Sequence, residues 1–296
     1  MTNSGEGDLP AAESDTADPG PTVMVPVLNP RTERALISLA SVLATHRDGR
    51  VLAVHVITVP DQTALSIAAE NREQIDAASS ELLDAATRDA AEFEVPIDTK
   101  TILSHRGIEA IFAAARSEAA DAVVMGYGPT KVAGGRVEGA LDELAHDLPC
   151  DFLILDAESF DPTDVLVPTV GGPSSDLSAE IVRALRAVRE VDPTLLHVVE
   201  EGAEAAGRDF LSAWAQEQDL AEADQLVAAG DPREVICRLG ESYSLVVLGA
   251  SERGLVSRIV HGSPALEAVE SLDVPVLLAE RPSSRSLWER LFGRWS

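Results

Sequence analysis

The chain has 296 residues, of which 45% are hydrophobic, so it is long enough for two domains with full cores. Its formal net charge is −27, because 50 acidic residues outnumber 23 basic ones, and the only lysines are Lys100 and Lys131. A surface this acidic argues against binding to duplex nucleic acid, because phosphate contacts need a basic face.

The N-terminal part of the chain predicts an acidic arm followed by one α/β domain. Residues 1–21 contain five acidic residues, no basic residue and several glycines and prolines, so we expect a disordered arm. Apolar runs of strand type then alternate with helical patterns, and these runs cover 23–28, 51–57, 97–103, 122–125 and 152–155. The alternation predicts right-handed βαβ units, a parallel sheet and a first domain over 22–157.

The alternation begins again after a polar break at 156–162, which suits a linker. The run from Val165 to Pro168 repeats the start of the first domain, and His197 repeats the strand position of His55. Two pairs of glycines are each 123 residues apart, Gly126 with Gly249 and Gly139 with Gly262. Equal shifts at two landmarks indicate a duplication, so we expect a second domain of the same class over 163–280.

The loop after the apolar run 245–248 has the most specific spacing in the chain. A buried strand that ends in Gly249 is expected to leave the carboxyl edge of a parallel sheet, where such folds bind ligands. Gly262 and Ser263 follow after twelve residues and indicate a helix start. This spacing resembles the signature of the universal stress protein family: a glycine, two residues, a glycine, nine residues, then a glycine with serine or threonine. Glu252 occupies the place of the second glycine.

The resemblance implies a tandem, haloarchaeal-like member of the family with two flavodoxin-like α/β domains, each a five-stranded parallel sheet with helices on both faces. It also implies that the halves pair within one chain as a pseudo-dimer, and a further homodimer stays open. In ATP-binding members this loop wraps the phosphates with backbone N–H groups, as a helix N-terminus can. The resemblance therefore places an ATP or AMP site in the second domain, at Gly249, Ser251, Arg253, Gly262 and Ser263.

Several departures from the family pattern weaken this expectation. Glu252 brings a negative charge to a loop that should wrap phosphates. The first domain keeps Gly126 and Gly139, but Pro129 and Ala140 replace the other two signature positions, so its site is degenerate. An aspartate that ATP-binding members carry after the first strand is absent from the matching positions, Asn29, Gly171 and Gly172. The next residues are expected to form the N-cap region of a helix, and they are Ser174, Ser175 and Asp176.

The sequence shows no catalytic or metal-binding constellation, so we expect a protein without enzymatic activity. Gly249-Ala250-Ser251 follows a strand as in the nucleophile elbow of hydrolases, but Arg253 occupies a place that needs a small residue. The six histidines are isolated, and no pair has the helix spacing of metal ligands. A weak nucleotide hydrolase or an esterase is the alternative, which an assay for turnover would reveal.

Residues 281–296 differ from the rest of the chain in charge and composition. Four arginines against one glutamate give a local charge of +3, from Arg281, Arg285, Arg290, Arg294 and Glu289. The large apolar residues share one arc of a helical wheel, namely Leu287, Trp288, Leu291, Phe292 and Trp295. We expect a basic amphipathic helix that docks on the acidic surface of the protein itself or on an external partner, a membrane surface or a transporter.

The composition also predicts a cytoplasmic protein, free or peripheral to the inner face of the membrane. Cys150 and Cys237 are isolated and fit free thiols in a reducing cytosol, and no apolar run is long enough to span a membrane.

The acidic excess with almost no lysine is typical of halophilic proteins, and an ordinary acidic bacterial protein is the alternative. We predict a regulatory or binding module of a stress response; the alternative is an accessory regulator of an amino-acid or ion transporter.

Overall fold

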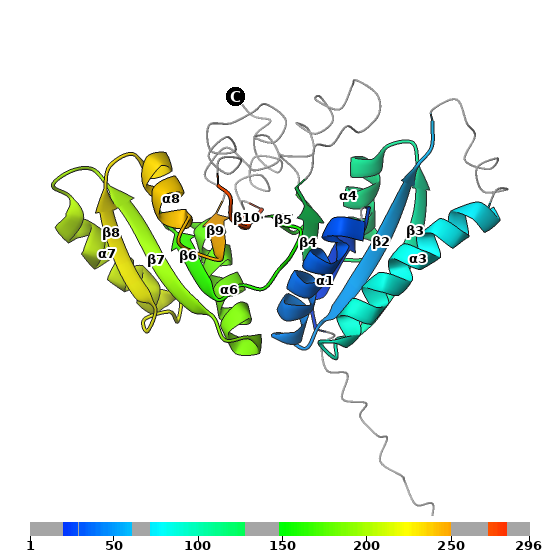
Figure 1. Cartoon of the computed structure of the whole chain (residues 1–296), viewed down its shortest axis with the longest axis horizontal. Helices are drawn as coiled ribbons and strands as arrows, with labels where there is room; N and C mark the ends of the chain where they lie inside the picture. Colours follow the sequence, from blue (N-terminus) through cyan, green and yellow to red (C-terminus); the bar gives the residue numbers. More distant parts are fainter. Residues whose placement is uncertain (1–19, 29, 61–71, 128–147, 250–271, 283–296) are drawn as a thin grey trace, which may run out of the picture.

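The computed structural model describes residues 20–28, 30–60, 72–127, 148–249 and 272–282. Within these ranges the chain forms one ten-stranded sheet with helices on both faces (Figure 1). The strand order is β3-β2-β1-β4-β5-β10-β9-β6-β7-β8. Each half of the chain contributes five neighbouring strands in the same order, so the duplication that the sequence predicts is present in the fold.

The first half forms the five-stranded parallel sheet that the alternation predicts. Its strands are β1 (Thr22–Pro26), β2 (Arg50–Thr58), β3 (Ile97–Ser104), β4 (Ala122–Gly126) and β5 (Asp151–Asp156). Its described helices are α1 (Pro30–Thr45), α3 (Arg72–Ala91) and α4 (Gly107–Ser117). All its strand pairs are parallel, which requires the crossover helices to cover the faces of the sheet.

The second half repeats this order. Its strands are β6 (Asp164–Pro168), β7 (Asp192–Val199), β8 (Asp224–Ala229), β9 (Leu245–Gly249) and β10 (Val276–Glu280). Its described helices are α6 (Pro173–Val188), α7 (Glu204–Glu217) and α8 (Pro232–Gly240). Pro26 and Pro168 are 142 residues apart, as are His55 and His197, so β1, α1 and β2 match β6, α6 and β7 in register.

The two halves meet edge to edge through β5 and β10. These strands are antiparallel, with Ile154 opposite Leu278 at the middle of the pair. An antiparallel pair has a local twofold axis perpendicular to the sheet, so matching helices of the two halves lie on the same face. The halves therefore pair within one chain, in the manner of the expected pseudo-dimer.

Two hydrophobic cores extend across this junction, one on each face of the sheet. One core packs α1, α3, α6 and α7 against alternate strand residues such as Val25 and Val167. The other core packs α4 and α8 against the intermediate strand residues, which face the opposite side of the sheet, such as Met24 and Leu166. Helices α1 and α6 lie side by side on one face of the sheet near the junction (Figure 1). Because each core contains residues of both halves, the halves are stabilised together.

The polar pattern after β5 predicts a plain linker, but the segment contains a buried aromatic residue. Phe160 is buried in the same core as residues of α1 and α6. Arg189, at the C-cap of α6, donates to Asp161 over 2.9 Å and places its guanidinium 5.4 Å from the ring centre of Phe93 in the first half. The segment therefore connects the halves in sequence and also helps to hold them together through its own contacts.

Both predicted terminal segments lie largely outside the described residues. The acidic arm does so up to residue 19, and the C-terminal helix does so from residue 283. Arg281 and Pro282 are described and directly follow β10. Among the described helices, none combines the length and apolar character that a membrane span requires.

Candidate functional site

The second half has a topological switch point between β6 and β9. The two strands are parallel neighbours, and the chain leaves β6 toward β7 on one side but leaves β9 toward β10 on the other. Ligands of open α/β sheets bind beyond the carboxyl ends of two such strands. The described residues at this edge belong to the segment 169–172, the first turn of α6 and Gly249.

Gly249 brings the end of β9 against the first turn of α6. A Cβ at this position would lie 2.7 Å from the carbonyl carbon and oxygen of Ser174 and from the backbone nitrogen of Ser175. A real Cβ does not come that close to backbone atoms, so any other residue would push the strand and helix apart. Ser174 and Ser175 carry the first N–H groups of α6, for which a helix has no internal acceptor. The chain thus leaves β9 beside a helix N-terminus, which favours an anion.

The segment between β6 and α6 depends on two glycines. Gly171 has φ +78° and Gly172 has φ +85°, a left-handed region that strains other residues. The Gly171 N–H donates to Oγ1 of Thr169 over 3.1 Å, and the Thr169 carbonyl accepts from Nδ1 of His197 over 2.8 Å. The ring of Phe210 packs on His197 with centroids 4.5 Å apart. Residues of β7 and α7 therefore fix the loop at the switch point.

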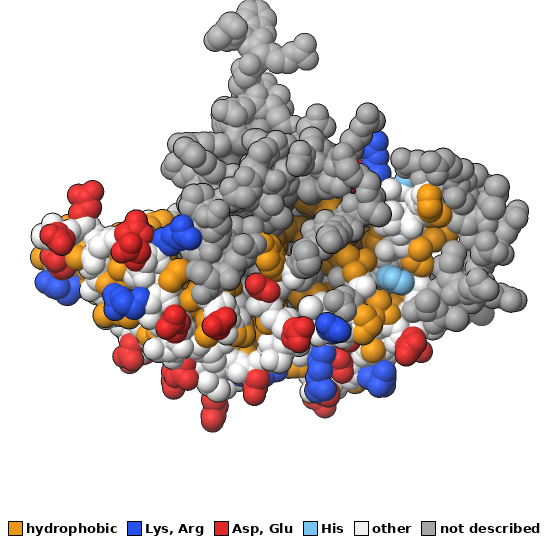
Figure 2. All heavy atoms as spheres, turned by 45° about the horizontal axis from the view of Figure 1, so that its top comes forward, with side chains coloured by type: hydrophobic (Ala, Val, Ile, Leu, Met, Phe, Trp, Pro, Cys, Tyr) orange, Lys and Arg blue, Asp and Glu red, His pale blue; other side chains and the backbone are white. Residues whose placement is uncertain are grey.

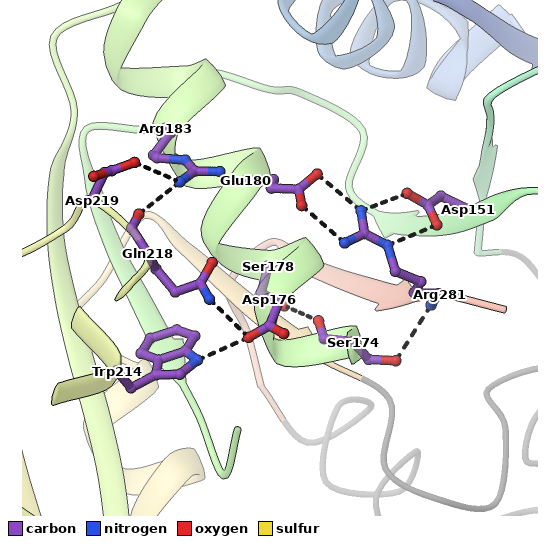
Figure 3. A network of polar contacts seen from close by, with 10 residues as sticks. All are labelled: Asp151, Ser174, Asp176, Ser178, Glu180, Arg183, Trp214, Gln218, Asp219 and Arg281. Atoms are coloured by element: carbon purple, nitrogen blue, oxygen red, sulfur yellow. Dashed lines mark hydrogen bonds and ion pairs between the residues drawn. The ribbon is translucent and has the colours of Figure 1, made fainter. Parts of the chain in front are cut away.

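The first turn of α6 is held by α7 on one side. The sequence predicts an N-cap region at Ser174, Ser175 and Asp176. The structure corrects this: Gly172 is the N-cap without a side-chain capping bond, and Pro173 follows, because proline suits the first helical position. The Asp176 carboxylate instead accepts from Nε1 of Trp214 over 3.0 Å and from Nε2 of Gln218 over 3.1 Å (Figure 3).

Arg281 contacts the same part of α6 from the other side (Figure 3). Its backbone N–H donates to Oγ of Ser174 over 3.3 Å. Its guanidinium donates to both oxygens of Asp151, over 3.1 and 2.8 Å, and to both oxygens of Glu180, each over 2.9 Å. These hydrogen bonds hold the pKa of Glu180 below its usual range, although burial acts the other way. They also raise the pKa of Arg281, so Glu180 and Arg281 stay ionised.

In the sequence, Arg281 belongs to the basic tail, and no local pattern indicates this cluster. Its carboxylate partners are 130 and 101 residues away in the chain, so no local pattern connects them. The duplication did give a signal that β10 and β5 are matching strands, which could be expected to pair. Such pairing predicts which strand ends meet, but not which charges they bring together.

The matching edge of the first half is built differently. A Cβ at Gly126 would lie 3.4 Å from Oγ1 of Thr32, which is an ordinary contact. Nδ1 of His55, the counterpart of His197, lies 2.9 Å from Oγ of Ser79 on α3 and so does not hold the loop after β1. Burial lowers the pKa of His55. The first half therefore lacks the close contact between strand and helix that distinguishes the second.

Helix α1 also carries a buried acid where α6 has a serine. Glu33 is 4% exposed and precedes Ser175 by the same 142 residues. Within the described part of the chain, its Oε1 atom has no hydrogen-bond partner. Burial raises the pKa of Glu33 to about 7; Asp89 on α3 adds to this rise, whereas Arg88 and Arg34 oppose it. The carboxyl is therefore protonated in part near neutral pH.

The residues predicted to bind nucleotide fall in two groups. Gly249 lies at the switch point of the second half and Gly126 at that of the first. The others lie outside the described residues, together with Glu252 and Asn29: Ser251, Arg253, Gly262, Ser263 and Gly139. The described residues contain no group of His, Cys, Asp and Glu side chains that could hold a metal ion. Burial raises the pKa of the Cys150 thiol to about 12, so this cysteine is unreactive.

The described surface is acidic and mixed in sign. Figure 2 shows Asp and Glu side chains along the rim of one face, with Lys and Arg side chains scattered between them. Exposed ion pairs of the described surface include Arg34 with Glu92 at 3.1 Å and Arg50 with Asp98 at 2.8 Å. The face drawn in Figure 2 thus has no continuous basic area among its described residues.

This architecture is similar to that of known proteins. The universal stress protein family matches residues 21–156. No curated protein has a matching sequence. A universal stress protein from Archaeoglobus fulgidus has a similar structure, with a TM-score of 0.61 at 15% identity over 88% of this chain and 98% of that one. The cytoplasmic domain of a prokaryotic cation chloride cotransporter has a TM-score of 0.56 at 11% identity, over 90% and 98% of the two chains. Both likenesses cover the two halves, so this doubled fold occurs in other proteins.

Proposed function

We propose that this chain is a regulatory binding module of the universal stress protein family, because residues 21–156 match that family. In this proposal the second half binds one nucleotide, ATP or AMP, without turnover. The nucleotide binds at the switch point between β6 and β9, and its phosphates face the first turn of α6. The stress response is the process in which such a module would act.

The contact between Gly249 and α6 carries this proposal. It combines a switch point, a helix N-terminus and a strand end that tolerates no side chain, at 2.7 Å from the helix backbone. The two left-handed glycines before α6 bring no side chain of their own to the same edge. These features fit a phosphate group, which needs backbone N–H donors and close approach. Gly262 and Ser263 of the signature would complete the phosphate contacts.

The direct test is to identify what the protein carries. The full chain is purified without added nucleotide, denatured, and the released small molecules are analysed by mass spectrometry. We expect AMP or ATP in an amount no greater than one per chain. If the released molecules contain no nucleotide and added ATP gives no heat of binding, the nucleotide proposal is wrong.

The second candidate is an accessory regulator of an ion or amino-acid transporter. Two observations support it: the same doubled fold forms the cytoplasmic domain of a cation chloride cotransporter, and the sequence after residue 282 is basic and apolar. The test removes residues 283–296 and keeps Arg281, because Arg281 is bonded to the folded part. Loss of membrane association with an unchanged melting temperature supports this candidate, and retained association counts against it.

We also propose that the protein is cytoplasmic and adapted to high salt. The support is the net charge of −27 with only two lysines. Carboxylates repel one another at low ionic strength, and salt screens that repulsion, so the melting temperature should rise from dilute buffer to molar potassium chloride. An unchanged or lower melting temperature in potassium chloride would show that the surface is merely acidic.

A further inference from the structure

The cluster around Arg281 joins three separate parts of the molecule. Asp151 begins β5 of the first half, Glu180 lies on α6 of the second half, and Arg281 ends the described chain after β10. The three side chains are only partly exposed, at 21%, 36% and 27% respectively. Four hydrogen bonds in two paired sets fix the guanidinium in one orientation, which a single ion pair would not do.

The backbone of the same residue reaches the candidate site. The Arg281 N–H donates to the Ser174 hydroxyl, and the backbone of Ser174 is the group that a Cβ at Gly249 would strike. Ser174 also binds within α6, because its carbonyl accepts from the hydroxyl of Ser178 over 3.1 Å. Arg281 thus contacts Ser174, the residue whose backbone lies against Gly249 at the edge of the site (Figure 3).

Among the described residues of the first half, the position that matches Arg281 carries no arginine. Gly126 pairs with Leu155 in β5, and Gly249 pairs with Ala279 in β10. Ala157 lies two residues after Leu155, and Arg281 lies two residues after Ala279. Ala157 is therefore the counterpart of Arg281. An alanine has no side chain that could bind two carboxylates. Within the described part of the chain, the arginine of this cluster thus follows the last strand of the half that has the close contact between strand and helix.

We propose that Arg281 is a positioning residue for the second-half site. It fixes the first turn of α6 against β9 and makes the affinity of that site depend on the first half, through Asp151. This inference rests on the proposed function for its ligand, but the placement of α6 can be tested without any ligand.

The test compares two arginines that both bridge the halves. Arg281→Gln removes the cluster at the start of α6, whereas Arg189→Gln removes the contacts with Asp161 and Phe93 at the other end of the same helix. Arg281→Lys keeps the charge but cannot bind two carboxylates in pairs. Binding of ATP is measured by calorimetry on the full chain, at equal salt and at a temperature where circular dichroism shows each variant folded.

We expect Arg281→Gln and Arg281→Lys to weaken ATP binding about tenfold, within the usual range for coupled sites, and Arg189→Gln to leave it unchanged. Hydrogen exchange gives a second result that needs no ligand. Amides of the peptide 173–180 should exchange about tenfold faster in Arg281→Gln but not in Arg189→Gln.

The two measurements separate this inference from the proposed function. If the wild type binds no ATP, the proposed function fails, and the exchange rates alone decide whether Arg281 positions α6. Unchanged exchange over 173–180 in Arg281→Gln overturns the inference. So does full ATP affinity in Arg281→Lys, because the arginine would then act only through its charge.

Discussion

The two halves have the same strand order but differ where each sheet meets its first crossover helix. In the second half, β9 lies so close to α6 that only glycine fits at position 249, and α6 is held from two sides by Asp176 and Arg281. In the first half, the equivalent glycine at position 126 has room for a side chain, and α1 buries an acid, Glu33. The duplicated fold thus has a close contact between strand and helix at one edge and an ordinary contact at the other.

This difference shows that strand order alone does not make a site. Both halves have a switch point between their first and fourth strands. The distinguishing features are local: a close backbone contact, two left-handed glycines and a fixed helix turn occur together only in the second half of the described chain. Mutations at matched positions of the two halves can therefore test which features matter.

The largest expected effect concerns Glu33. Its carboxyl has a pKa of about 7 in the folded chain, against 4.5 without burial, so the folded state holds its proton to higher pH than the unfolded state. The stability that this proton confers is complete below pH 4.5 and is lost as pH rises through 7, by about 3 kcal/mol in all. We expect Glu33→Gln to remove this loss, which denaturant titrations between pH 5 and 8 at constant salt would measure.

The matched control for this prediction is Ser175→Ala in the second half. Ser175 has no titratable group, so the difference between this variant and the wild type should not change with pH. A parallel fall in stability of the wild type and Glu33→Gln between pH 5 and 8 would mean that Glu33 does not carry the raised pKa.

The next largest effect concerns the two glycines. Gly249→Ala places a Cβ against the backbone of α6 and should lower the free energy of unfolding by about 2 kcal/mol, as overpacked sites do. Gly126→Ala meets only an ordinary contact with Thr32, so its effect should stay within about 0.5 kcal/mol. Denaturation midpoints of the two variants measure this difference. Equal midpoints would show that the close contact at Gly249 relaxes without cost.

The smallest effect concerns the substituted signature positions. Glu252→Gly removes a negative charge from the expected phosphate loop and should strengthen ATP binding by about 1–2 kcal/mol. Pro129→Gly is the matched change in the first half and should not create binding there. Calorimetry at equal salt measures both. Tight binding by the wild type, with no gain in Glu252→Gly, would show that the Glu252 carboxylate does not face the ligand.

Much of the fold was predictable from the sequence because its signals are local. Short apolar runs that alternate with helical patterns predict the parallel sheets, and the glycines at 126 and 249 end the strands as expected. The equal spacing of landmarks predicts the second half. His55 and His197 do occupy equivalent positions, although their hydrogen-bond partners differ.

The features that distinguish the halves were not predictable in this way. The partners of Arg281 lie more than 100 residues away, and a basic residue beside other arginines suggests a tail. Asp176 looks like a helix cap in sequence, but α7 supplies donors that only the tertiary structure brings near. Phe160 is the single large apolar residue in a polar segment, too short a pattern to predict burial.

The central claim is that the second half binds one nucleotide and the first half binds none. Calorimetric titration of the full chain with ATP, alongside Gly249→Ala and Gly126→Ala, tests it most directly. We expect one site per chain in the wild type and in Gly126→Ala, and at least about tenfold weaker binding in Gly249→Ala, because the added Cβ displaces the α6 N-terminus. Two sites per chain, or loss of binding in Gly126→Ala with full binding in Gly249→Ala, would contradict the claim.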